Sequence, residues 1–134
     1  MEIASFDDLL RAARAQAQPQ RLLFVFAGAG LPADASAEQR AQFEAGAGGE
    51  LTPLMCVDKT PDELASFADL AAESARAGPP WAIVFAAALS GRDGRAPTPR
   101  DAEAPLLRMV ESIKGGRLDG MVPFDRHGAP VRLA

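Results

Sequence analysis

The sequence has very few of the residues on which catalytic and metal sites are commonly built. Its 134 residues include one cysteine, Cys56, one histidine, His127, and no tyrosine. A single cysteine cannot form an internal disulfide, a CxxC redox pair or a structural zinc site made of cysteines. A lone histidine leaves no two-histidine metal site and no Ser-His-Asp set whose partners can be placed. The sequence therefore predicts no catalytic residues, no metal site and no cofactor.

The chain also lacks an excess of basic charge and a long apolar run. Residues 1–67 carry 5 basic and 10 acidic side chains, and residues 68–134 carry 9 and 8. A nucleic-acid binder normally has a cluster of lysine and arginine, because phosphate contacts supply much of its affinity. The longest apolar runs, 22–27 and 81–89, fall short of the roughly 20 residues that span a bilayer, and the first residues do not fit a signal peptide. We expect a cytoplasmic protein that binds neither nucleic acid nor membrane.

Hydrophobic periodicity predicts helices that alternate with strands. Apolar positions at helical spacing predict an amphipathic helix over 5–17, and capping boxes predict helices that begin at Ser36 and at Thr60. A fourth helix ends at Gly115 and has Pro105 near its first turn. Apolar runs typical of strands covered on both faces lie at 22–27, 51–57 and 81–89. Two short segments around His127, at 122–124 and 131–133, predict a hairpin that its prolines confine to a sheet edge.

This order of elements predicts one α/β domain over residues 1–134. Strands that alternate with helices and are buried on both faces favour a mostly parallel central sheet. We therefore expect a three-layer sandwich, with helices on both faces of the sheet and an antiparallel hairpin at its C-terminal edge.

In open α/β sheets, ligands bind beyond the carboxyl ends of the strands. If the three strands are parallel, their following loops meet at one rim. The candidate ligand-binding residues at that rim are Gly28, Gly30, Asp58, Lys59, Ser90, Arg92 and Arg95.

Each of these features has a structural interpretation beside the functional one. Gly28 and Gly30 with Ala33 match the GxGxxA pattern of dinucleotide sites, but the next helix begins too late, which favours a plain glycine-rich turn. The arginines suit phosphate or carboxylate groups, or they belong to a solvated, mobile loop. Asp58 and Lys59 form either an acid-base pair or an ordinary charged exit from a strand.

Three single residues favour structural roles. Cys56 lies within a predicted strand, where a cysteine is usually a small, inert and buried residue. His127 is expected in a hairpin turn. Trp81 is expected to anchor its strand against a helix.

Four segments together resemble a family of small proteobacterial proteins, and the resemblance covers nearly the whole chain. Members of this family are often labelled "ribonucleotide reductase subunit alpha". A catalytic α subunit is far longer and uses several cysteines, so we interpret the label as a misannotation or as the sign of an accessory protein, and it brings no catalytic residues. The segments that carry the resemblance are SFDDLLRAARAQAQPQRLLFVFA, PLMCVDKTPDELASF, WAIVFAAALSG and PFDRHGAPVRL.

The leading hypothesis from the sequence is a non-catalytic binding or accessory module for a protein partner or a small anionic ligand. One alternative is a small enzyme that uses Asp58, Lys59 and the loop arginines on a phosphorylated or carboxylated substrate. A second is an accessory protein of ribonucleotide reductase. A homodimer formed through the edge hairpin is a further possibility.

Overall fold

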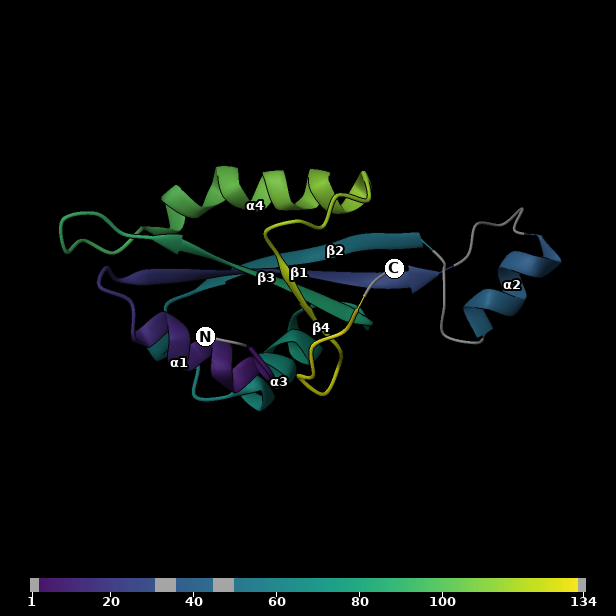
Figure 1. Cartoon of the computed structure of the whole chain (residues 1–134), viewed down its shortest axis with the longest axis horizontal. Coiled ribbons are helices and arrows are strands. Elements are labelled where there is room, and N and C mark those ends of the chain that lie inside the picture. Colours follow the sequence, from purple (N-terminus) through teal and green to yellow (C-terminus); the bar gives the residue numbers. More distant parts are fainter. Residues whose placement is uncertain (1–2, 31–35, 45–49, 133–134) are drawn as a thin grey trace.

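The computed structural model describes residues 3–30, 36–44 and 50–132. Four strands form a single sheet, and four α-helices and one 3-10 turn connect or cover them (Figure 1). In chain order the elements are α1 (Phe6–Arg14), β1 (Gln20–Gly30), α2 (Ala37–Glu44), β2 (Glu50–Lys59), η1 (Pro61–Glu63), α3 (Phe67–Ala77), β3 (Ile83–Ser90), α4 (Pro99–Lys114) and β4 (Val122–Phe124).

The sheet is antiparallel throughout, so the prediction of a mostly parallel sheet is wrong. The strand order is β2-β1-β3-β4, and every neighbouring pair is antiparallel. β2 and β3 run in the same direction, but β1 lies between them and pairs with both.

Two features of the sequence explain this error. The continuous apolar run of β1 does indicate burial on both faces, but an antiparallel sheet with helices on both sides satisfies the same pattern. The position of α2 between β1 and β2 in the sequence predicts a crossover between parallel strands. Instead, β1 and β2 pair directly, and α2 lies beyond the ends of both strands (Figure 1).

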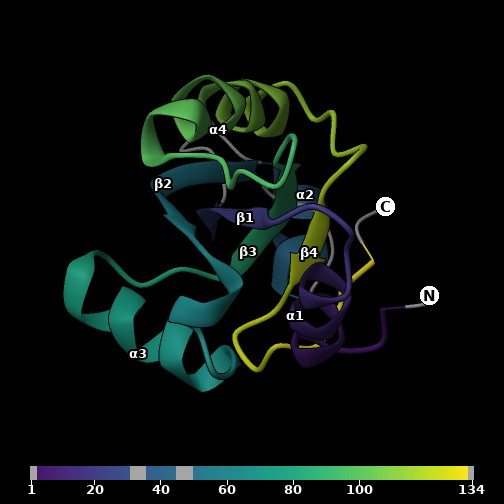
Figure 2. The ribbon, with the colours of Figure 1, turned by 90° about the vertical axis from the view of Figure 1, so that its left-hand side faces the viewer.

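Helices cover both faces of the sheet, and each face has its own apolar core (Figure 2). Alternate residues of β1 point to opposite faces, as the two-residue period of a strand requires. Phe24 and Phe26 enter the core beneath α1 and α3, whereas Leu23 and Val25 enter the core beneath α4. All four side chains are at most 2% exposed, which makes β1 the centre of both cores.

The core beneath α1 and α3 is aromatic. The Phe6 ring of α1 lies 5.7 Å from the Phe24 ring, 5.1 Å from that of Phe67 and 5.3 Å from that of Phe124. The contacts with Phe67 and Phe124 are edge-to-face, a geometry that aromatic rings favour. This cluster joins α1, α3 and both the central and the edge strand.

Trp81 lies buried against α3, as the sequence predicts. Its Nε1 donates a hydrogen bond of 2.8 Å to Ser74 Oγ, and the Ser74 hydroxyl in turn donates to the Ala71 carbonyl oxygen. The indole N–H is therefore satisfied inside the core, which a buried tryptophan requires.

The helix predicted to begin at Thr60 begins six residues later, after Ser66. The backbone N–H of Thr60 donates to the Glu63 carboxylate, but the structure that follows is only the 3-10 turn η1. Leu64 then takes an extended conformation and is 1% exposed. The Arg14 guanidinium donates to the carbonyl oxygens of Pro61 and Leu64. Burial of Leu64 and these two bonds end the turn, and α3 begins after Ser66.

Two other boundaries differ from the sequence prediction. Pro105 lies inside α4 rather than near its first turn. The C-terminal hairpin is short: Phe124 pairs with Pro130, and Val131 donates to the Pro123 carbonyl oxygen. Leu133, at the end of the second predicted hairpin segment, lies outside the described residues.

The outer strand β2 is irregular at its middle. Phe26 pairs with Met55, but the next residue of β1, Ala27, pairs with Pro53. Leu54 is therefore an extra residue in β2, a bulge, and its side chain is 37% exposed.

A tight turn near the C-terminus is fastened to the start of α1. Asp125 Oδ1 accepts hydrogen bonds from the backbone N–H groups of His127 and Ala129. The Gly128 carbonyl oxygen accepts from the Phe6 N–H at 3.1 Å. His127 is thus a turn residue, as predicted, and the turn joins the two ends of the chain.

Gly128 should be the position of this turn that tolerates substitution least. Its φ is +82°, and a Cβ atom there would lie 2.8 Å from Phe67 Cγ. Gly120 has a similar φ of +83° with no heavy atom within 4 Å of the added Cβ. We expect Gly120→Ala to cost about 1–2 kcal/mol from backbone strain alone. Gly128→Ala should cost about 1–3 kcal/mol more, because the added methyl group overpacks against Phe67. The free energy of unfolding of both variants can be measured in urea. Equal losses of stability in the two variants would contradict this account.

Asp125 should make the turn sensitive to acid. The two backbone N–H groups that donate to its carboxylate hold its pKa below the usual 3.8. A lowered pKa stabilises the fold at neutral pH, and this contribution is lost as the pH falls through the lowered value. Wild type should therefore exceed Asp125→Asn in stability at pH 7, and the difference should shrink below pH 3.8. The exposed Asp119 provides the control: Asp119→Asn should leave thermal stability unchanged across the same range.

Candidate functional site

The predicted rim divides between the two ends of the sheet. Gly30 pairs with Glu50 at one end, and Gln20 pairs with Ser90 near the other. The nearer glycine, Gly28, is eight residues along β1 from Gln20, a separation of about 25 Å in a strand. The structure therefore separates Gly28 and Gly30 from Asp58, Lys59, Ser90, Arg92 and Arg95. Ala33 of the dinucleotide pattern lies outside the described residues.

Asp58 and Lys59 share an end of the sheet but not a face. Asp58 pairs with Leu23, whose side chain enters the core beneath α4, whereas Lys59 pairs with Leu22 of the opposite core. Asp58 Oδ2 accepts from Arg21 Nε at 2.5 Å, and Lys59 Nζ lies 2.5 Å from Glu73 Oε1. The two side chains therefore form separate ion pairs: that of Asp58 joins β2 to β1, and that of Lys59 joins β2 to α3.

Ser90 and the glycine after it hold the end of β3 in place. Ser90 Oγ accepts a 3.0 Å hydrogen bond from Gln20 Nε2. The Gly91 N–H donates to the Pro19 carbonyl oxygen at 2.8 Å. A Cβ atom on Gly91 would lie 2.1 Å from the Arg95 carbonyl oxygen, so only glycine permits this close approach of two backbones.

Arg92 and Arg95 flank a two-residue β-turn. Arg92 N–H donates to the Arg95 carbonyl oxygen at 3.1 Å, and Arg95 N–H donates back at 2.9 Å. The central residues Asp93 and Gly94 have φ of +53° and +77°. Two positive φ values define a type I′ turn, for which Asp-Gly is a preferred sequence. We call residues 91–95 the arginine hairpin.

Gln18 fixes the tip of this hairpin. Its Oε1 atom accepts a 2.9 Å hydrogen bond from the Gly94 N–H, across 76 residues of sequence. Together with the Pro19 carbonyl oxygen, it ties the hairpin to the segment before β1. The predicted mobile loop is thus a bonded hairpin, and Gln18 and Gln20 were not recognised from the sequence. The Asp-Gly pair between two arginines was the available signal.

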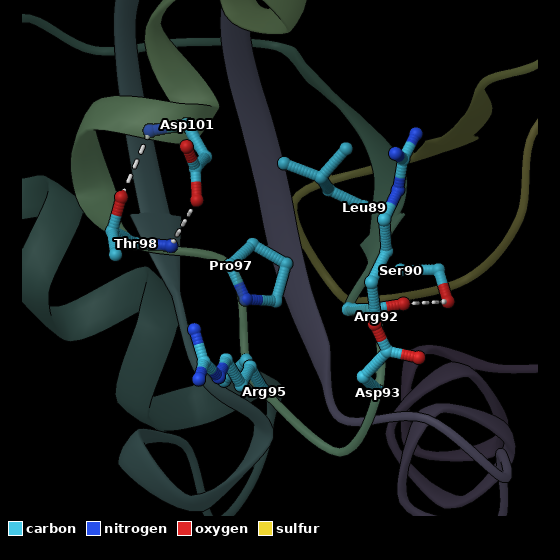
Figure 3. A pocket seen from close by; sticks show the side chains of 10 residues that line it. Leu89, Ser90, Arg92, Asp93, Arg95, Pro97, Thr98 and Asp101 are labelled. Atoms are coloured by element: carbon cyan, nitrogen blue, oxygen red, sulfur yellow. Dashed lines mark hydrogen bonds between the residues drawn. The ribbon is translucent and has the colours of Figure 1, made fainter.

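An open hollow of about 820 Å³ lies beside the arginine hairpin (Figure 3). Its apolar part includes Leu89 and the buried Pro97, and its charged part comes from both arginines and two aspartates. The lining residues are Leu89, Ser90, Gly91, Arg92, Asp93, Arg95, Ala96, Pro97, Thr98 and Asp101.

The charges around this hollow differ in whether they have partners. Asp101 caps α4: its carboxylate accepts from the Thr98 N–H at 2.9 Å, and this bond lowers its pKa. Arg92 and Arg95 are exposed, and neither forms an ion pair with a carboxylate of the described residues. Asp101 is thus engaged by the start of α4, whereas both guanidinium groups and the exposed Asp93 carboxylate are available to a ligand.

Cys56 differs from its prediction. It lies exposed on the edge strand β2 rather than buried. Neighbouring atoms still desolvate the sulfur and raise the pKa of the thiol, which favours the neutral form over the reactive thiolate.

The described ranges 3–30, 36–44 and 50–132 contain neither a metal-binding cluster nor a membrane-spanning helix. No group of three or more histidine, cysteine, aspartate or glutamate side chains in these ranges is arranged to hold a metal ion. None of the helices described there has the length and apolar character needed to cross a bilayer.

Comparison of the chain with protein-family models, with curated proteins and with solved structures finds no match. The ribonucleotide reductase resemblance therefore stays a prediction.

The hydrogen bond from the Gly94 N–H to Gln18 Oε1 should control how often the tip of the arginine hairpin opens to solvent. In Gln18→Ala the Gly94 amide loses its acceptor, so its hydrogen exchange, measured by NMR, should accelerate at least tenfold. Gln16→Ala is the matched control, because the Gln16 side chain bonds only the Ala12 carbonyl oxygen within α1. Unchanged exchange at Gly94 in Gln18→Ala would show that other contacts hold the hairpin.

Proposed function

We propose that this protein is a non-catalytic binding module that recognises an anionic group through the arginine hairpin. The anionic group belongs to a protein partner or to a small ligand. The observation that carries the proposal is the pair of exposed guanidinium groups on a preformed turn, neither with a carboxylate partner among the described residues. Guanidinium groups bind carboxylate and phosphate oxygens through charge-assisted hydrogen bonds.

The geometry of the turn supports this proposal. Arg92 and Arg95 are directly opposite each other, so their Cβ atoms are about 5 Å apart on one face of the hairpin. Like charges in this arrangement destabilise a hairpin by up to about 1 kcal/mol. An anion bound there would relieve the repulsion, which favours the bound state over the free one.

The fixed backbone also favours binding. Hydrogen bonds from Gly91 to Pro19 and from Gly94 to Gln18 order the hairpin before any ligand arrives. Ordering a loop on binding lowers affinity, so a loop ordered in advance avoids that cost.

The positions of Asp58 and Lys59 argue against the alternative of a small enzyme. That alternative needs both side chains to act with the arginines on one substrate, within hydrogen-bond reach of the reacting atoms. The two lie on opposite faces of the sheet, and each is held in an ion pair.

Removal of the arginines should abolish anion binding without unfolding the protein. We expect inorganic phosphate and citrate to raise the melting temperature of wild type and to bind in calorimetry. Charged hydrogen bonds contribute about 1.5–3 kcal/mol each, so Arg92→Ala and Arg95→Ala should each weaken binding at least tenfold. The resemblance implies a ribonucleotide reductase as the protein partner, so binding of such an enzyme should also be measured by calorimetry.

The matched control is Arg108→Ala, which removes another exposed arginine, on α4 and outside the hollow. It should bind like wild type. If no anion binds, or if Arg108→Ala loses as much affinity as the hairpin variants, the proposal is wrong.

A further inference from the structure

The arginine hairpin and its hollow also restrict the kind of anion that fits. Figure 3 shows the side chains of Arg92 and Arg95 pointing away from each other, with Pro97 between them in this view. Two separated negative groups therefore match the arginines better than one compact anion.

The surface between the arginines is partly apolar. Leu89 is half-buried, Pro97 is buried, and Ala96 is exposed at the rim of the hollow. A ligand that places an apolar group here would remove it from water, at about 25 cal/mol for each Å² buried. Inorganic phosphate has no such group.

The openness of the hollow favours a protein segment over a small molecule. Sites for small molecules enclose most of the ligand surface. Here the end of β3, the arginine hairpin, the short connection to α4 and the first turn of α4 supply the lining residues, and seven of the ten are exposed. A segment that belongs to a folded or longer chain needs no such enclosure.

We infer that the arginine hairpin binds an acidic protein segment in which two carboxylates stand on either side of an apolar side chain. The inference rests on the proposed function and names its partner. In an extended segment, residues i, i+2 and i+4 share one face, and the outer two lie about 13 Å apart. The expected pattern is acidic, apolar and acidic at these three alternate positions, with the acidic groups on Arg92 and Arg95 and the apolar group near Leu89 and Pro97.

The probe is a fluorescein-labelled peptide with the core Glu-Ser-Leu-Ser-Glu, measured by fluorescence anisotropy with the full chain. Three matched peptides replace both glutamates by glutamine, replace the leucine by serine, or bring the two glutamates next to each other. We expect the glutamine peptide to lose at least tenfold in affinity, and the other two at least threefold. Arg92→Ala and Arg95→Ala should each bind the original peptide with at least tenfold lower affinity.

Ala96→Asp tests the position of the peptide independently of the arginines. Ala96 is exposed, so this variant should keep the wild-type melting temperature. Its new carboxylate should repel the acidic peptide and lower the affinity at least fivefold. Arg108→Ala should again bind like wild type.

The results distinguish this inference from the proposed function. If phosphate binds through Arg92 and Arg95 but the original peptide binds no better than the glutamine peptide, the acidic segment is wrong and the anion site stands. If the serine and adjacent-glutamate peptides equal the original, the spaced pattern is wrong. If neither phosphate nor peptide binds, both proposals fail.

Discussion

The burial of β1 on both of its faces is the constraint on which the rest of the structure depends. Its even-numbered residues from Leu22 to Phe26 enter the aromatic core, and its odd-numbered residues from Leu23 to Ala27 enter the core beneath α4. A strand that is apolar on both faces must be covered on both sides, and its backbone groups must pair with a strand on each flank. β2 and β3 flank it, α1 and α3 cover one face, and α4 covers the other (Figure 2).

The sequence predicted which segments are buried better than it predicted how strands pair. Phe6, Leu9 and Leu10 lie on the buried face of α1, and Trp81 packs on α3, because side-chain periodicity reports burial directly. Strand direction depends on the path of the connections, which periodicity does not contain. The helix α2 looks like a crossover in sequence, yet it lies outside the sheet, and this one difference reverses β1 relative to its expected direction.

The same limit applies to the candidate site. Arg92 and Arg95 follow a buried strand, a position that does not depend on the direction of that strand, and their binding role stays a prediction. Gly28 and Gly30 are predicted at the same rim, and the antiparallel arrangement moves them to the other end. The position of Gln18 could not be predicted from local pattern, since it depends on a hydrogen bond to Gly94 across 76 residues.

The irregular outer strand β2 affects how copies of this protein behave beside one another. An edge strand exposes unpaired backbone groups that can template a strand from another molecule. Pro53 has no N–H to donate, and the extra residue at Leu54 breaks the regular alternation of the backbone at the same place. Both features disfavour regular pairing of a second chain along the full length of this edge, as proline and bulges do at the edges of natural sheets.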